Sequence, residues 1–281
     1  MGAESIILKF EQNGRAISAG TGFEDYKIVS VEGLTALEFD FMATYNPQLP
    51  GATIKRAKPL MRQIDVVMDC SSALRDHAIG FFNPYDEGRL TVTRGGVTRW
   101  IPYKCHPVRV GQDNIYNDLT LQIRLISERP YFLDMSDYGK NIAQKRPLLA
   151  FPFVMLRDRG LITDYRILSS EVGIRNDGDV PVSAEIVFRA IGSAKNPVLT
   201  LNKKQFLRAV VNMTSGDEVR FNTNPRQLTS TMNGVDILNQ TDPHGSFFQI
   251  PRGQNIIEYS ADEGVSNLSV YVFYRPQYLG V

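Results

Sequence analysis

The sequence predicts a mainly β protein with two domains, the first containing one packed helix and the second built from strands alone. Apolar and polar residues alternate with a period of two along much of the chain, one segment has helical spacing, and one proline-containing stretch interrupts the alternation near the middle. The chain has 281 residues, a length typical of about two domains.

The first half contains several predicted strands. The alternation is clearest in residues 36–43, 62–70 and 117–126, where every second residue is apolar over much of the segment. This pattern is typical of a strand that buries one face. Residues 89–103 predict a β-hairpin, because Gly95-Gly96 supplies the positive φ angles that a two-residue primed turn requires.

One helix is predicted over residues 71–84. Its apolar residues have the spacing of a single helix face: Leu74, Ala78, Phe81 and Phe82. Ser71 or Ser72 can cap its start, and Asn83-Pro84 ends it. We expect this apolar stripe to pack into the core of the first domain or that of a neighbouring copy.

A domain boundary is predicted within residues 127–153, which contain Pro130, Pro147 and Pro152 and mix charges of both signs. We therefore expect a first domain at residues 1–135, a linker at 136–150 and a second domain at 151–281.

The second domain is predicted to be a β-sandwich. Short strand-like segments alternate with turn clusters such as "RNDGDVP" and "QTDPHG", a spacing typical of sandwich folds. The expected strands lie at residues 181–191, 206–213, 216–223, 246–250, 255–261 and 268–274.

The composition bounds the class of protein. The net charge of +1 provides no overall field for nucleic acid or an acidic membrane. Two cysteines, Cys70 and Cys105, are too few for a disulfide scaffold at this length and suit a reducing cytosol. We find neither a targeting segment nor an apolar run long enough to span a membrane. We expect no sequence-specific binding of nucleic acid and no membrane insertion.

The search for reactive residues predicts no catalytic, cofactor or metal site. The three histidines His77, His106 and His244 are scattered along the chain. The adjacent Cys105-His106 pair would point to opposite faces of an extended segment, so a thiol–imidazole dyad is disfavoured. Gly20-x-Gly22 has no third glycine and no following helix pattern, which favours a simple turn. The chain is therefore not expected to be an enzyme.

A basic cluster lies at Lys55, Arg56, Lys58 and Arg62. Stacking aromatics of the kind found in nucleic-acid sites do not accompany these residues. We favour a solvated rim, and the functional alternative is a polar contact with a protein partner.

Several segments, spread in order along nearly the whole chain, carry a resemblance to one known family. They are "VEGLTALEFDF", "PLMRQIDVVMD", "AIGFFNPYDEGRLTV", "ERPYFL", "IRNDGDVPVSAEIVFRAIGSAKNP", "SFFQIPRGQNIIEYSAD" and "SVYVFYRPQYLGV". The most specific part combines the Pro-Arg-Gly-Gln-Asn turn at 251–255 with the Tyr-Leu-Gly-Val ending at 278–281. In these segments the chain resembles the siphophage distal tail proteins.

The resemblance implies a split-barrel-like first domain that forms a ring and a galectin-like β-sandwich as the second domain. It also implies a six-fold ring at the virion tail tip, made in the bacterial host cytoplasm. The implied partners are other copies of the chain, the tail tube protein, the tail-tip protein and, in some relatives, receptor-binding proteins. The implied function is that of a structural hub of the tail tip or baseplate, without a cofactor.

Two other functions stay open as alternatives. A carbohydrate-binding, lectin-like tail protein would use the sandwich domain, although Trp100 is the only tryptophan in the chain. A cell-wall hydrolase of the tail tip would need a metal site or a pair of acidic residues that the sequence does not single out.

The last residues of the chain are apolar. We expect Tyr278, Leu279 and Val281 to fold back and seal the bottom of the second domain or its seam with the first, with Gly280 allowing the turn. The alternative is a surface that meets a partner only in an assembly.

Overall fold

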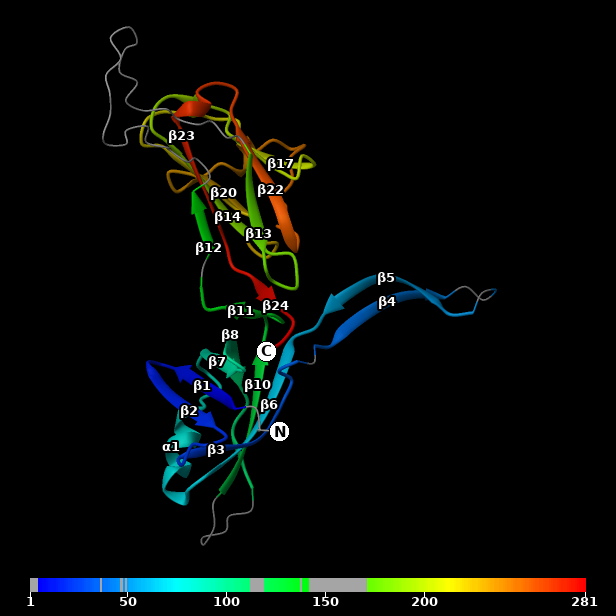
Figure 1. Cartoon of the computed structure of the whole chain (residues 1–281), viewed down its shortest axis with the longest axis vertical. Helices are drawn as coiled ribbons and strands as arrows, with labels where there is room; N and C mark the ends of the chain where they lie inside the picture. Colours follow the sequence, from blue (N-terminus) through cyan, green and yellow to red (C-terminus); the bar gives the residue numbers. More distant parts are fainter. Residues whose placement is uncertain are drawn as a thin grey trace, which may run out of the picture. The chain divides into compact units, whose positions relative to one another are not determined.

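The computed structural model describes residues 5–35, 37–45, 48, 50–111, 119–136, 138–141 and 171–281 (Figure 1). The chain divides into two compact units. Unit 1 comprises Met1–Met135 together with Gln277–Val281, and unit 2 comprises Ser136–Pro276. Within the described residues, no helix is long and apolar enough to cross a membrane.

Unit 1 is built on one mixed sheet that closes on itself. In order across the sheet its strands are β24 (Gln277–Tyr278), β11 (Phe132–Asp134), β8 (Val97–Cys105), β7 (Gly88–Arg94), β1 (Ile6–Gln12), β2 (Arg15–Gly20), β3 (Tyr26–Glu32), β6 (Arg62–Cys70), β10 (Leu119–Ser127) and β9 (Arg109–Val110). A further pairing of β8 with β10 closes the strands between them into a barrel.

The barrel is closed through two short seams. β2 and β3 run parallel and share the single pair Gly20↔Lys27. β8 and β10 share Leu125↔Cys105 and the next pair along. The other neighbouring strands in the ring pair over longer stretches, as β6 and β10 do from Leu119↔Cys70 to Ser127↔Arg62. The barrel therefore consists of two groups of extensively paired strands, which are joined at two places by only one or two residue pairs.

The expected hairpin and the helix stripe are both present. β7 and β8 meet at Arg94↔Val97 around Gly95-Gly96, whose φ angles are 55° and 82°. Helix α1 (Arg75–Phe81) follows a 3-10 turn, η1 (Ser72–Leu74). Ala78, Phe81 and Phe82 are buried in the core of unit 1, and Leu74 packs against it.

The start of the helix differs from expectation. Ser71 precedes η1 and makes no side-chain capping bond, and the residue that caps α1 itself is Leu74. The 3-10 turn takes the place of a capped first turn, since it satisfies a backbone donor through the bond from Leu74 N to Ser71 O.

A long hairpin forms a separate two-stranded sheet in unit 1. It consists of β4 (Phe39–Tyr45) and β5 (Ala52–Pro59), which pair from Phe39↔Pro59 to Tyr45↔Ala52 with a bulge after Met42. The expected strand at 36–43 therefore exists, but its apolar residues are not in the barrel core. The basic residues expected on a solvated rim lie on β5, except for Arg62, which begins β6.

Unit 2 is a two-sheet β structure around one core. One sheet has the order β12 (Tyr138–Asn141), β23 (Leu268–Tyr274), β14 (Ala184–Ala190), β19 (Glu218–Asn222), β20 (Thr229–Met232) and β21 (Val235–Asp236). The other has the order β13 (Glu171–Asn176), β22 (Gly253–Ser260), β16 (Val198–Leu201) and β17 (Gln205–Arg208). The remaining elements are the paired β15 (Ala194–Lys195) and β18 (Asn212–Met213) and the 3-10 turns η2 (Leu238–Gln240) and η3 (Val265–Asn267).

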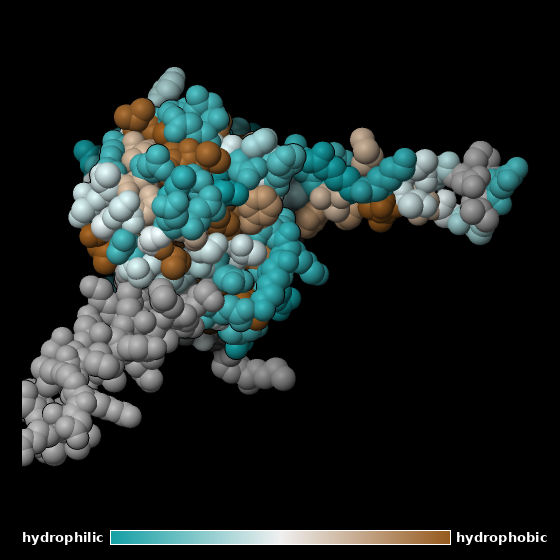
Figure 2. Space-filling model, turned by 90° about the horizontal axis from the view of Figure 1, so that it is seen from above, coloured by the Kyte–Doolittle hydropathy of each residue, from teal (hydrophilic) through white to brown (hydrophobic). Residues whose placement is uncertain are grey.

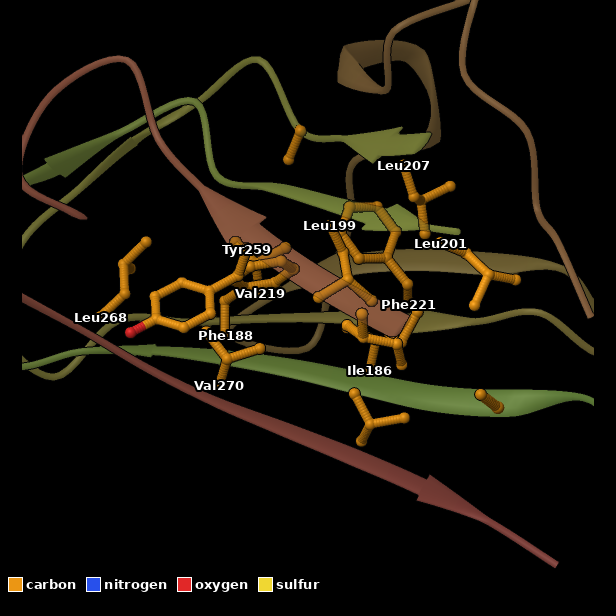
Figure 3. Close-up of a cluster of buried hydrophobic side chains, with 14 of the residues drawn as sticks. Ile186, Phe188, Leu199, Leu201, Leu207, Val219, Phe221, Tyr259, Leu268 and Val270 are labelled. Atoms are coloured by element: carbon orange, nitrogen blue, oxygen red, sulfur yellow. The ribbon is translucent and has the colours of Figure 1, made fainter. Parts of the chain in front are cut away.

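Both sheets contribute alternate residues to the core of unit 2. Figure 3 shows side chains such as Phe188, Phe221 and Tyr259 converging from several strands. The rings of Phe188 and Phe221 meet edge to face with their centroids 6.1 Å apart. The alternation read from residues 268–274 places Leu268, Val270, Val272 and Tyr274 in this core. The prediction of a mainly β fold with one helix is confirmed for the described residues.

Three segments differ from the sequence prediction in position. Residues 138–141 of the expected linker form a strand of unit 2, while residues 137 and 142–150 lie outside the described residues. Residues 277–281, expected in the second domain, belong to unit 1 because β24 pairs with β11. The expected strand at 246–250 contributes a single bridge between Ile250 and Val182.

Truncating Phe82 should destabilise unit 1 strongly. Phe82 is 1% exposed and meets Phe10 edge to face with centroids 5.2 Å apart. Phe82→Ala should lower the free energy of unfolding by about 3–5 kcal/mol, since it leaves a cavity in a closed core. Chemical denaturation measures this change. The control is Ile79→Ala on the same helix, where the side chain is 39% exposed. A loss below about 1 kcal/mol at Phe82 would contradict the packing.

Candidate functional site

The histidines and cysteines do not converge on a reactive site. Among the described residues, no group of three or more His, Cys, Asp or Glu side chains could hold a metal ion. The Nδ1 atom of His77 lies 3.0 Å from the hydroxyl oxygen of Tyr26. The backbone N–H of His106 donates to the carbonyl of Arg124. Gly22 lies in a turn before β3, so the structure does not build a phosphate loop there.

The adjacent residues Cys105 and His106 lie in different environments. Cys105 is 6% exposed and belongs to the core of unit 1, whereas His106 is exposed. Burial raises the pKa of the Cys105 thiol to about 11. A thiol with that pKa stays protonated at neutral pH and is a poor nucleophile.

A buried arginine organises one side of unit 1. Arg62 is 1% exposed, although its sequence context favoured a solvated rim. Its guanidinium donates to the carbonyls of Pro130 (2.7 Å), Gly33 (2.6 Å), Leu34 (3.2 Å) and Leu279. Burial lowers its pKa to about 10, so the group remains charged at neutral pH.

The last five residues are held on unit 1 by Arg62, by Arg99 and by a backbone hydrogen bond. Leu279 accepts from Arg62, while Gly280 accepts from Arg99, whose guanidinium also lies 3.5 Å from the ring centroid of Tyr278. The backbone N–H of Val281 donates to the carbonyl of Leu34 at 3.3 Å. We call residues 277–281 with Arg62 and Arg99 the C-terminal latch.

The chain end folds back as expected, but its contacts are with unit 1. The last residues pack on unit 1, so they do not seal the bottom of the second domain. Leu279 is 38% exposed and contributes through its carbonyl, while Tyr278 and Val281 supply the apolar contacts with the core. Gly280 is required for a close approach, because a Cβ there would lie 2.9 Å from the carbonyl oxygen of Leu34.

The β4–β5 hairpin is amphipathic and largely exposed on both faces. One face, here called the hairpin apolar face, consists of Phe39, Phe41, Ala43, Tyr45, Ala52, Ile54, Ala57 and Pro59. Phe41 is 56% exposed, Ile54 60% and Tyr45 76%. The opposite face carries the pairs Asp40↔Lys58, Met42↔Arg56 and Thr44↔Thr53. In Figure 2 the extension on the right is mainly teal on one side and tan to brown on the other.

An exposed apolar ribbon of this kind is typical of an interaction surface. Two-stranded hairpins are marginally stable alone in water, and contiguous exposed apolar surface marks sites of association. The rings of Phe39 and Phe41 stack with centroids 6.0 Å apart and present a continuous aromatic strip. The sequence showed the alternation of this segment, but not that its apolar face would be free of the barrel.

Comparison with known proteins finds one family match, within unit 2, and one similar fold over nearly the whole chain. Residues 177–278 match the family model of the siphovirus-type tail component, C-terminal domain. The crystal structure of the Dit protein of phage SPP1, described as a paradigm of the hub adsorption apparatus in phages that infect Gram-positive bacteria, is similar over 96% of this chain and 98% of that one. The TM-score is 0.69 at 10% identity, which shows a shared fold.

Two further comparisons add little. A chain of the phage P2 baseplate in its activated conformation with Ca aligns over 96% of this chain and 98% of its own, with 10% identity and a TM-score of 0.47, too low to support an argument. A search of curated proteins finds no match. The sequence-based resemblance to distal tail proteins is confirmed by the family match and the SPP1 fold.

Both native thiols should resist modification. Cys70 and Cys105 are 2% and 6% exposed, and at a pKa of about 11 roughly one Cys105 thiol in a thousand is ionised at pH 8. Ellman's reagent at pH 8 should label neither residue in the native protein and both after denaturation. The variant Thr53→Cys, on the exposed hairpin, should react at once and serves as the control. Rapid native labelling of Cys105 would contradict its burial.

Breaking the C-terminal latch should destabilise unit 1. Arg62→Met leaves buried carbonyls without their charged donor and should cost at least about 2 kcal/mol of unfolding free energy. Deleting residues 277–281 should also lower the melting temperature. Because both changes remove the contact between Arg62 and Leu279, their combined cost should be smaller than the sum of the separate costs.

The control for the latch is Arg56→Met on the exposed hairpin, which should change stability by less than about 0.5 kcal/mol. Strict additivity of Arg62→Met and the deletion would show that the arginine and the chain end act independently.

Proposed function

We propose that this chain is a structural hub of a siphovirus-type tail tip. Residues 177–278 match the siphovirus-type tail component domain, and the chain shares the fold of the Dit protein of phage SPP1. In this proposal six copies form a ring that joins the tail tube to the tail-tip protein and supports host-attachment proteins. Unit 1 makes most of the ring contacts. The galectin-like unit 2 lies outside them, and no catalytic step is assigned to the chain.

The hairpin apolar face is the observation that carries the proposal. A ring requires a surface that fits a different surface on the next copy, in a head-to-tail contact that closes. A protruding ribbon can reach a neighbour, and its exposed side chains, including Phe41 and Tyr45, bury most of their surface only against another molecule. Burying these side chains against a neighbouring copy removes apolar surface from water, which favours association.

The basic residues of β5 support the same assignment. Lys55, Arg56 and Lys58 are exposed on the hairpin, and Lys58 and Arg56 lie on the face opposite the apolar strip. This arrangement separates a hydrophobic contact from a charged one on a single ribbon. The charged face would favour one docking orientation, because other orientations would bring like charges together across the interface.

Disrupting the hairpin apolar face should prevent ring assembly without unfolding the protein. In the double variant Phe41→Lys and Tyr45→Lys, two exposed apolar side chains become charged. Light scattering and negative-stain imaging, with and without the tail-tip protein, should show hexameric rings for the wild type in at least one condition. The variant should remain monomeric in both.

The matched control is Met42→Lys with Thr44→Lys, on the other face of the same strand, which should leave assembly within about twofold of the wild type. A wild-type chain that stays monomeric in both conditions would overturn the hub proposal. If both double variants form rings equally well, the ring contact does not involve the hairpin apolar face.

A further inference from the structure

Strand β3 is paired along only one of its two edges. On one side it pairs with β6 along its length, and on the other it shares only the pair Gly20↔Lys27 with β2. Because β2 runs parallel to β3 and ends at Gly20, the later residues of β3 extend past the end of β2. Among the described residues, the side of 28–32 that faces away from β6 has no strand partner. We call this side the open edge of β3.

Unpaired backbone groups determine what can cover such an edge. A strand edge presents a row of N–H and C=O groups that another extended backbone satisfies in register, and strand addition is a recurring mode of protein association. A bulge at Val29 limits the regular ladder to Ser30–Glu32. That length is similar to the seams of the barrel, which have one or two residue pairs. Side chains beside so short a ladder must supply much of the binding.

The side chains of β3 divide between an apolar and a polar face. Ile28 and Val31 pack against the core of unit 1 but are only partly buried. Ser30 and Glu32 are exposed on the other face. A strand that is apolar on one face and polar on the other would therefore continue both faces of β3.

The polar face beside β3 is hollowed. A groove of about 520 Å³ there is lined by residues of β3, β6, β10 and the segment 106–109. Asp65 in this groove is already paired with Arg124 at 2.7 Å, and Arg109 lies on β9, which β6 and β10 separate from β3. Glu32 makes no ion pair within the described part of the chain. Its carboxylate is therefore available to an incoming cation.

The β4–β5 hairpin has the complementary arrangement. Within the described residues, β5 pairs only with β4, so its outer edge is open as well. Arg56 and Lys58 are exposed on the face opposite the hairpin apolar face. If β5 pairs so that the hairpin apolar face continues the side of Ile28 and Val31, its basic side chains lie on the side of Glu32 and the groove.

Charge favours β5 as the added strand. The exposed turn before β3 carries Glu24 and Asp25, so with Glu32 this region has three carboxylates against the single amine of Lys27. β5 carries three cations and no carboxylate. The reverse orientation of β5 would place these cations against the partly buried apolar face of β3 and leave them without a counter-charge.

The two edges must come from different copies of the chain. The hairpin begins just after β3 and extends away from the barrel (Figure 1), so it leaves the open edge of its own chain behind. We propose that β5 of one copy adds to the open edge of β3 in the next copy. This inference rests on the proposed hub function and names the surface that receives the hairpin. It joins two different surfaces, as a head-to-tail ring requires.

Cysteine crosslinking of the full-length protein tests the contact. Ser30→Cys is mixed under ring-forming conditions with Thr53→Cys, Arg56→Cys or Lys58→Cys and then oxidised; all four sites are exposed, whereas the native cysteines are buried. At least one mixture should give at least ten times more covalent dimer than either variant alone. Val97→Cys, 46% exposed near the β7–β8 turn, replaces Ser30→Cys as the control and should give no such excess.

Charge reversal tests the orientation of β5. Glu32→Lys should weaken ring assembly at least tenfold, and adding Arg56→Glu or Lys58→Glu to the same chain should restore it to within threefold of the wild type. The control is Asp76→Lys on α1, where the side chain is 90% exposed, which should stay within twofold. Melting curves select the folded variants.

The outcomes separate this inference from the hub proposal. A wild type that stays monomeric in every condition would overturn both. Rings that form without any crosslink would overturn the β3 contact and leave the hub in place. A crosslink that forms only after residues 1–4 are deleted would show that the chain covers its own edge, which also overturns the contact. Failure of both reversals to rescue Glu32→Lys would overturn the orientation.

Discussion

The arrangement of unit 1 depends on the hydrogen bonds that Arg62 donates to backbone carbonyls. A buried guanidinium must satisfy its donors, and here the acceptors come from segments far apart in the sequence: the turn at Gly33 and Leu34, the segment at Pro130, and Leu279 near the chain end. Removing any acceptor would leave a charged donor buried and poorly paired, which is more costly than losing an ordinary surface contact. The arginine therefore fixes the relative positions of these three segments.

The same contact sets the base of the protruding hairpin. Leu34 precedes β4 and Arg62 follows β5, so their bond joins the two ends of the segment that leaves the barrel. The bond from Leu60 N to Glu38 O closes the base a second time. Gly33, at φ 84°, is required there because a Cβ would lie 2.1 Å from the carbonyl oxygen of Gln63. The hairpin, which has no core of its own, is thus held at its base by these two contacts.

The sequence predicts those parts of the structure that depend on local periodicity. Alternation located β6, β10, β14 and β23, and helical spacing located the buried stripe of α1. The prediction for Arg62 was wrong because it relied on the charge of the side chain. In a strand, every second residue faces the same side, so Arg62 faces the core together with Ile64 and Val66. The two-residue pairing of β24 with β11 left no such signal, since it depends on residues separated by most of the chain. The open edge of β3 left none either, since it depends on where the pairing with β2 stops.

The hairpin shows why a correct strand prediction can still misplace a surface. Alternation in 36–43 reports that one face of the strand is apolar, but the pattern is the same whether that face meets its own barrel or another molecule. Only the three-dimensional structure shows that the barrel is already closed without β4 and β5. The apolar strip is therefore in excess of what unit 1 needs to fold. A contiguous exposed apolar strip of this kind is typical of a surface that meets another molecule, which is the role that the proposed ring gives it.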